Sequence, residues 1–365
     1  MKVMSYPART GQWLIAALML LAVTVHAQES ATAEPGAGGE KKQESPWLLA
    51  PTISSDPKVG TSAGGLGGYL FKIDPDSTSS MAGAMATYSN TDSLIAGLFL
   101  RSFWNADARR FSAVALGGRI RNDYEDFLGS GLPISSTDEV KMFFSRYQQE
   151  VVPHWFLGAQ AIYTNYLIVG DNFTSAEVLK LTGLTGYDAA GLGLVAQYDT
   201  RDSKNSPLSG MNVLFNNFAY RESFGGEVSF DAYNLKGLHY LPHGNGHVFA
   251  THVDGRWTDD APSSGYSSVT LRGYTRGQYL APHSFLVEFE ERIHVKGRFG
   301  INLFAGVACL YGDGLSCDDS ANLYSSFGIG AQYVLKPSER IVITMDYAQG
   351  EGGNNGFYMR FGQAF

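Results

Sequence analysis

Beyond residue 27, the 365-residue sequence lacks any apolar run as long as the ~20 residues that a membrane-spanning helix needs. It also lacks a basic surplus: 35 acidic against 27 basic residues give a net charge of −8, which argues against nucleic-acid binding. Cysteine is scarce, with Cys309 and Cys317 only, and too few other ligands surround the pair for a metal site. We therefore expect no metal, no cofactor and no nucleic-acid partner.

The first 27 residues have the pattern of a secretory signal peptide. Lys2 and Arg9 precede an apolar run at 13–25, and small residues lead to a cleavage site after Ala27. The alternative, a retained anchor, is disfavoured because the run is short for a spanning helix. Residues 28–45 have no apolar periodicity and are predicted to form a flexible periplasmic lead-in. In an exported chain, two cysteines eight residues apart favour a disulfide.

Glycine and aromatic residues are abundant instead: 43 Gly, 22 Phe and 20 Tyr, at a mean hydropathy of only −0.11. From Trp47 onward, segments with alternating polar and apolar residues are separated by turn signals. We count sixteen strands: 47–55, 63–74, 80–90, 92–104, 107–122, 140–152, 154–168, 188–201, 209–222, 228–241, 246–258, 279–295, 299–312, 325–336, 340–349 and 355–365. Connections alternate between short and long, as periplasmic turns and external loops do.

This pattern predicts an all-β fold, a 16-stranded antiparallel transmembrane β-barrel over residues 46–365 with both termini periplasmic. A charge facing lipid at mid-membrane would cost ~2–4 kcal/mol, so the carboxylates within strands 284–295 and 340–348 are expected to face the lumen. A soluble β-sandwich or propeller is the alternative fold. The C-terminus argues against it, because the last strand resembles an outer-membrane targeting signal carried by Gly356, Met359, Phe361 and Phe365. Its apolar residues are expected on one face: Phe357, Met359, Phe361 and Phe365.

Several segments resemble the barrel of the BamA/TamA bacterial surface-antigen superfamily, and together they cover residues 47–365. "QYDTRDSKNSPLSG" (197–210) is similar to the family's turn signature, and "LRGYTRG" (271–277) to the motif of its sixth external loop. "IVITMDYAQGEGG" (341–353) and "FYMRFGQAF" (357–365) resemble its last two strands, and residues 123–139 are weakly similar to its third outer loop.

The resemblance implies that the sixth loop folds into the lumen and is held there by its arginine. The loop motif is Leu271, Arg272, Gly273 and Tyr274. Family members often offer this arginine an Asp on the thirteenth strand, but Phe304 stands at that position. The candidate partners are then the acidic residues that strand alternation places on the lumen face: Glu288, Glu290 and Asp346. The alternative is a solvated loop arginine, as we expect for Arg276 at the rim.

The turn motif carries charges that could suggest acid–base catalysis: Tyr198, Asp199, Thr200, Arg201, Asp202, Pro207 and Gly210. A structural role is favoured, because Asp and Arg side chains tie turns by hydrogen bonds while Pro and Gly set the backbone. The pattern Gly-x-Ser-x-Gly occurs once, at 60–64, but no helix follows this Gly-rich segment, whereas a nucleophile elbow needs a strand-to-helix turn, so no enzyme activity is expected.

The resemblance implies a role in the insertion or transport of proteins at the outer membrane of a Gram-negative bacterium. The alternative is a passive pore or structural envelope barrel, since residues 28–45 are too few for the family's periplasmic domains. Expected partners are outer-membrane lipid and lipopolysaccharide, and client outer-membrane or secreted proteins, around a monomeric barrel. Pro46 and Pro51 remove hydrogen-bond donors from the first strand and predict a weak seam with the last one.

Overall fold

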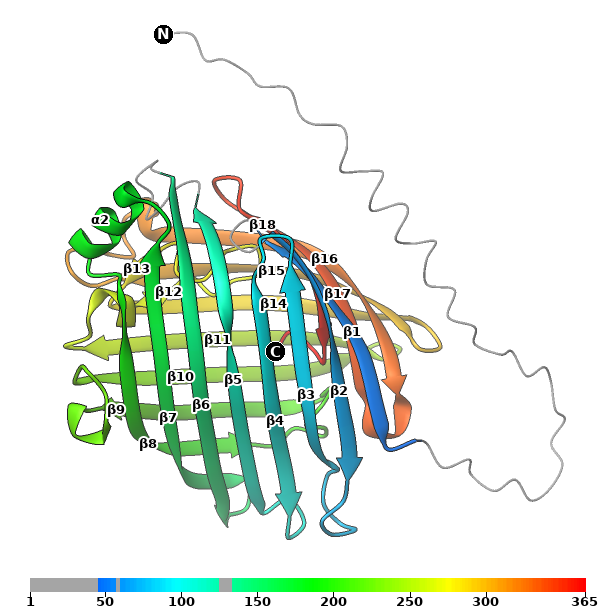
Figure 1. The fold of residues 1–365 in the computed structure, drawn as a ribbon. Helices are drawn as coiled ribbons and strands as arrows, with labels where there is room; N and C mark the ends of the chain where they lie inside the picture. Colours follow the sequence, from blue (N-terminus) through cyan, green and yellow to red (C-terminus); the bar gives the residue numbers. More distant parts are fainter. Residues whose placement is uncertain (1–44, 57–59, 125–132) are drawn as a thin grey trace, which may run out of the picture. The chain divides into compact units, whose positions relative to one another are not determined.

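The computed structural model describes residues 45–56, 60–124 and 133–365. Within them, sixteen antiparallel strands close into one barrel, in which β1 meets β18 (Figure 1). The predicted all-β fold and strand number are confirmed. The predicted signal peptide, and the lead-in up to residue 44, lie outside the described residues.

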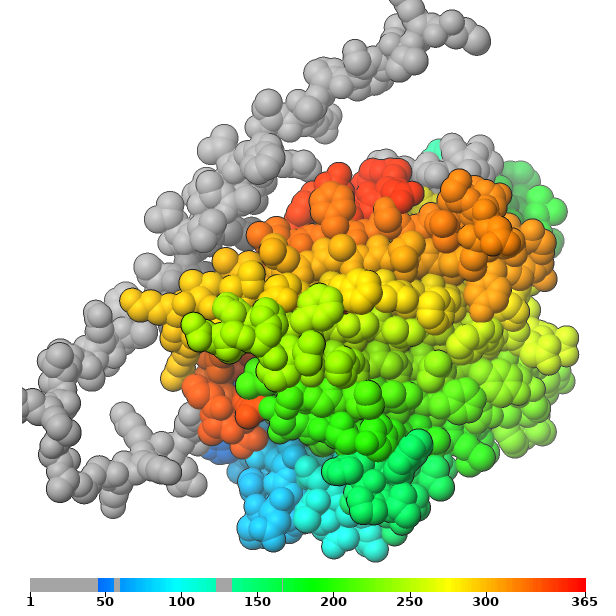
Figure 2. Space-filling view, turned by 180° about the vertical axis from the view of Figure 1, so that it is seen from behind, coloured from blue at the N-terminus to red at the C-terminus, as the bar shows by residue number. Residues whose placement is uncertain are grey.

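The first eight barrel strands are β1 (Trp47–Asp56), β2 (Gly60–Phe71), β3 (Ser80–Ser89), β4 (Leu94–Trp104), β5 (Arg109–Tyr124), β6 (Ile134–Val152), β7 (Trp155–Gly170) and β8 (Gly186–Asp199). The other eight are β9 (Gly210–Tyr220), β10 (Phe230–His243), β11 (His247–Asp259), β14 (His283–Lys296), β15 (Phe299–Tyr311), β16 (Leu323–Lys336), β17 (Ile341–Gly350) and β18 (Asn355–Phe361). Figure 2 shows the wall from behind, where strands coloured from green to orange lie side by side.

Three features differ from the predicted strand pattern. Strand β6 begins at Ile134 rather than at residue 140, so it continues into the segment taken for an outer loop. The segment before β14 forms part of a separate two-stranded sheet, β12 (Ser267–Ser268) with β13 (Leu280–Ala281). Helix α2 (Phe173–Leu181) was not predicted; its buried Leu179 packs with Ile134 and Leu184.

Four 3-10 helices also occur in the described chain: η2 (Glu222–Phe224), η3 (Ser263–Gly265), η4 (Ser320–Asn322) and η5 (Pro337–Glu339). No helix among the described residues is long and apolar enough to span a membrane, a finding that concerns helices alone.

Side chains alternate between the lumen and the outer face, as strand geometry requires. On β14, Glu288 and Glu290 are buried, whereas their neighbours Phe285 and Phe289 are exposed on the outside. Exposed outward aromatic residues gather near one end of the barrel: Trp47, Tyr69, Tyr147, Trp155 and Phe299. Such a girdle is typical of a barrel wall at a membrane–water interface.

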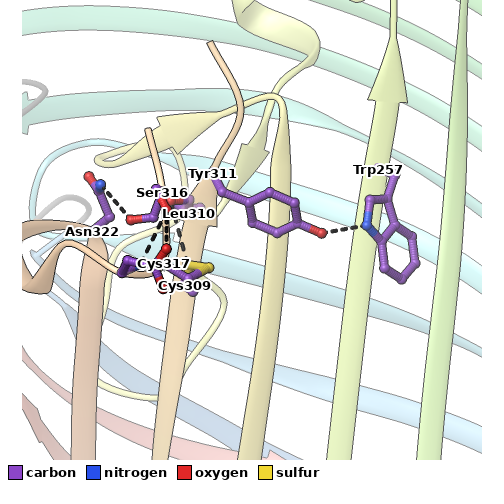
Figure 3. Close-up of a disulfide and its surroundings, with 8 residues drawn as sticks. Trp257, Cys309, Leu310, Tyr311, Ser316, Cys317 and Asn322 are labelled. Atoms are coloured by element: carbon purple, nitrogen blue, oxygen red, sulfur yellow. Dashed lines mark hydrogen bonds between the residues drawn. A yellow bond between two sulfur atoms is a disulfide. The ribbon is translucent and has the colours of Figure 1, made fainter. Parts of the chain in front are cut away.

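The two ends of the barrel differ in their connections. Turns as short as 153–154 and 297–298 join strands at one end, here the short-turn end, where β1 begins and β18 finishes. Longer segments, including 171–185 and 260–282, join strands at the long-loop end. There Cys309 and Cys317 form a disulfide, as the sequence favours, with their Cα atoms 5.7 Å apart (Figure 3).

Candidate functional site

The loop between β11 and β14 folds into the lumen. The pairing of β12 with β13 pinches its base, and Leu271 and Tyr274 are buried among apolar side chains that include Leu286 and Leu310. Gly273 has φ +95°, and a Cβ there would lie 3.2 Å from the backbone nitrogen of Gly350. The motif therefore needs glycine at this position to bring the loop against the end of β17.

Arg272 reaches all three carboxylates named from the sequence. Its Nε donates to Glu288 at 2.7 Å, and its Nη1 donates to Glu290 at 2.7 Å and to Asp346 at 3.3 Å. The guanidinium carbon lies 3.3 Å from the centre of the Phe304 ring. The aromatic residue at the family's Asp position thus supports the cation by its face, and carboxylates on β14 and β17 supply the charge.

Two further arginines complete this cluster, which we call the Arg272 cluster. Arg292 donates to Glu290 at 2.8 Å, and Arg360 donates to Asp346 at 3.0 Å. The cluster comprises three guanidinium groups and three carboxylates: Arg272, Arg292, Arg360, Glu288, Glu290 and Asp346. Its formal charge is balanced, which limits the cost of burying it. Arg292 and Arg360 were not predicted from the sequence as members of this cluster. The alternation along their strands, which places both on the lumen face, could have indicated them.

Backbone and hydroxyl contacts tie the loop to the last three strands. The Tyr274 hydroxyl donates to the carbonyl of Ser325 at 2.8 Å and accepts from the Glu351 N–H at 2.9 Å. The Gly273 N–H donates to the Tyr358 hydroxyl at 3.1 Å. Arg276, in contrast, is exposed. The loop is therefore attached to β16, β17 and β18, on one side of the seam.

At the short-turn end, the turn 200–209 is organised around Asp199. This carboxylate is completely buried and accepts from Arg110 at 2.7 Å, from Arg201 at 2.9 Å and from Lys204 at 2.9 Å. Asp202 accepts from two backbone N–H groups of the same turn, Leu208 and Ser209. Both carboxylates thus have structural partners, as the turn prediction requires.

The remaining turn-motif residues hold the backbone or contact the wall. Tyr198 packs on Trp155 with ring centres 5.1 Å apart, and Gly210 has φ +95°. Thr200 pairs through its backbone N–H with the carbonyl of Met211. The carbonyl of Pro207 accepts from Arg292 at 3.4 Å, so this turn reaches the Arg272 cluster.

The seam between β1 and β18 is short. In the described chain these strands pair at Ser54 with Tyr358 and at Ser55 with Phe357. On its other side, β1 pairs with β2 along its whole length, from Trp47 with Tyr69 to Asp56 with Gly60. The stretch 47–53 of β1 therefore has no ladder to β18, and Pro51 lies within it without an N–H to donate.

The C-terminal tail corrects one sequence prediction. Strand β18 ends at Phe361, and Gly362, with φ +95°, turns the chain away from the strand path. Phe365 then stacks on His252 inside the lumen at 4.8 Å, and its carbonyl accepts from Arg292 at 3.0 Å. The prediction that Phe365 shares one face with Met359 and Phe361 is wrong. Gly356, Met359 and Phe361 do lie in β18.

No family model and no curated protein sequence matches the chain. Solved structures do. BamA from Haemophilus ducreyi lacking POTRA domains 1–3 is 12% identical, with a TM-score of 0.56 over 88% of this chain and 71% of that one. CdiB from Acinetobacter baumannii is 10% identical, with a TM-score of 0.59 over 86% of this chain and 59% of that one. CdiB from Escherichia coli is 10% identical, with a TM-score of 0.56 over 87% and 63%.

At these identities the likeness concerns the fold. The fold is that of Gram-negative outer-membrane β-barrels, with sixteen strands closed upon themselves. The chain spans about three fifths of the length of the two CdiB proteins.

Proposed function

We propose that this protein is a barrel of the BamA/TamA superfamily that inserts or translocates proteins at the outer membrane of a Gram-negative bacterium. In this proposal the short-turn end faces the periplasm, and the seam between β1 and β18 opens to pair with a client strand. The observation that carries it is the short seam, paired only at Ser54–Tyr358 and Ser55–Phe357 in the described chain.

Unpaired backbone groups on β1 would form the hydrogen bonds to a client strand. A strand edge with free N–H and C=O groups is a template for another strand, and such groups cannot stay unpaired in lipid. The stretch 47–53 of β1 supplies that edge. The strand across the seam is anchored, because Arg360 of β18 pairs with Asp346 and Tyr358 accepts from the loop at Gly273. Opening would therefore move β1 away from a fixed β18.

Seam locking tests this function. Ser55→Cys with Phe357→Cys places two cysteines at a paired position of the seam, and Ala63→Cys with Tyr88→Cys does the same between β2 and β3. We expect oxidation of the seam pair, but not of the control pair, to lower the level of folded client proteins in the outer membrane, with recovery on reduction. Unchanged outer-membrane protein profiles in the locked seam variant would reject the proposal.

The alternative is a passive pore. Against it, the loop 260–282 occupies the lumen at the long-loop end. At the other end, the turn 200–209 accepts from Arg101 of β4 and donates to the carbonyl of Glu339, between β16 and β17. In planar bilayers we expect small, intermittent conductance from the wild type. A large, stable conductance would favour the pore.

A further inference from the structure

The inner wall formed by β2 to β7 is apolar, although the lumen of a barrel is normally polar. Residues in register across these strands share a face, and those facing the lumen between the two ends are mostly aliphatic or aromatic: Leu66, Met81, Met85, Phe99, Val114, Leu116, Met142, Phe144 and Ile162. Met85 is 39% exposed and the other residues of this wall are half-buried, so the lumen loop and turn cover the wall only in part. We call it the apolar inner wall.

A row of cationic and polar residues borders the apolar inner wall toward the short-turn end. Arg101 of β4 pairs in register with Ser112 of β5, which pairs with Arg146 of β6. The adjacent row toward the long-loop end is apolar, with Phe99, Val114 and Phe144 in register. The Cα atoms of the two arginines thus lie two strands apart, roughly 10 Å at the usual strand spacing.

Neither guanidinium has a carboxylate partner among the described residues. Arg101 donates to the carbonyl of Lys204 at 3.2 Å and to the Asn205 side chain at 3.5 Å. Arg146 donates to the Gln160 side-chain oxygen at 2.9 Å and 2.7 Å. In the Arg272 cluster and at Asp199, by comparison, each arginine meets a carboxylate. The two cations beside the apolar wall are therefore available to an anion from outside the chain.

A cavity connects Arg101 with the seam. Its volume is about 280 Å³, and its lining includes Arg101, Phe99, Met81 and Leu66 from the wall and Phe361 and Gly362 from the end of β18. This is near the lower end of the ~300–1,000 Å³ of small-molecule sites, and mostly apolar with few polar groups, as such sites are. A cavity of this volume suits a single alkyl chain better than a folded peptide.

We propose that the apolar inner wall binds a long-chain fatty acid. The carboxylate lies between Arg101 and Arg146, and the acyl chain runs along Phe99 and its neighbours toward Met85. The two arginines favour an anionic head group, because each guanidinium offers a planar fork of hydrogen-bond donors to a carboxylate. The apolar rows beside them favour an alkyl chain as the rest of the ligand. The site does not depend on the seam function proposed above.

Binding of radiolabelled palmitate to the barrel in nanodiscs of zwitterionic lipid, with empty nanodiscs subtracted, tests the site. We expect Arg101→Gln with Arg146→Gln to weaken binding by tenfold or more. The matched control is Arg109→Gln, an exposed arginine that begins β5 outside the row. Hexadecanol, which has the chain without the charge, is expected to compete poorly.

A second variant keeps the test decisive if the double substitution does not fold. Met85→Glu leaves both arginines in place and puts a carboxylate on the apolar wall, and we expect it to weaken palmitate binding by tenfold or more. Folding of each variant is checked by heat-modifiable gel mobility. Wild-type affinity in the folded variants, or equal competition by hexadecanol and unlabelled palmitate, would overturn the proposal.

Discussion

The aromatic ring of Phe304 lies directly against the guanidinium of Arg272, with 3.3 Å between the ring centre and the guanidinium carbon. Phe304 is only 5% exposed. It occupies the position at which the resembling family often has an aspartate, yet the Arg272 cluster is already balanced by Glu288, Glu290 and Asp346. An aspartate here would add a buried negative charge with no cation left to pair with it.

This contact predicts which of two substitutions at Phe304 destabilises the barrel more. Phe304→Ala removes the ring and leaves a cavity, which costs ~3–5 kcal/mol for a buried phenylalanine. Phe304→Asp loses the same packing and adds a surplus charge, so we expect a lower stability still, partly restored by Glu290→Gln. The temperature at which the folded gel band disappears measures this order. Phe327→Ala, on the exposed outer face, is the control. A Phe304→Asp barrel as stable as wild type would contradict the charge argument.

The contribution of Arg272 to the stability of the barrel is expected to depend on the shape of its guanidinium as well as on its charge. Arg272→Ala leaves three buried carboxylates with too few cations, and breaking a buried ion pair typically costs ~3–5 kcal/mol. Arg272→Lys keeps the charge but has a single ammonium, whereas the guanidinium reaches Glu288 and Glu290 through separate nitrogens. We therefore expect its loss of stability to lie between those of wild type and Arg272→Ala. Limited proteolysis of the loop 260–282 and the gel transition measure both effects.

The exposed Arg276 provides a matched control within the same loop, and Arg276→Ala is expected to match wild type. Glu290→Gln combined with Arg272→Ala should be less unstable than Arg272→Ala alone, because one unpaired charge is removed. Equal gel transitions for Arg272→Ala and wild type would show that the loop is held by its apolar contacts.

The sequence predicted the strands of the barrel better than the contacts inside its lumen. Lipid on one side and water on the other impose a period of two, so the lumen parity of Glu288, Glu290 and Asp346 could be predicted from alternation alone. The turn of the tail at Gly362 and the contact of Gln363 with Ser206 could not, because each depends on residues distant in sequence. The stacking of Phe304 on Arg272 was missed for another reason: only an acidic partner was sought there.

The turn 200–209 is expected to loosen in acid. Burial alone would raise the pKa of Asp202, but its bonds from Arg340, Leu208 and Ser209 outweigh burial and hold that pKa below its usual value. A depressed pKa in the folded state stabilises above the unfolded-state pKa, and this contribution is lost as pH falls through the folded-state pKa. Hydrogen exchange of the Leu208 and Ser209 amides should therefore accelerate in acid beyond the intrinsic trend. In Asp202→Asn this extra acid dependence should be absent; if it persists, another carboxylate is responsible.

The C-terminal residue is predicted to act in the finished barrel, separately from any targeting role of the last strand. Phe365 contacts His252 and Arg292 in the lumen, whereas Phe361 ends β18. We expect Phe365→Ala to assemble at a near-normal rate but to melt at a lower temperature, because it loses a partly buried ring that packs on His252 beside the Arg272 cluster. Phe361→Ala, which alters the strand itself, should slow assembly more than it lowers the final stability. Pulse-chase assembly followed by heat titration separates these effects. If Phe365→Ala slows assembly and leaves the melting temperature unchanged, the terminal ring serves targeting alone and its lumen contacts contribute little.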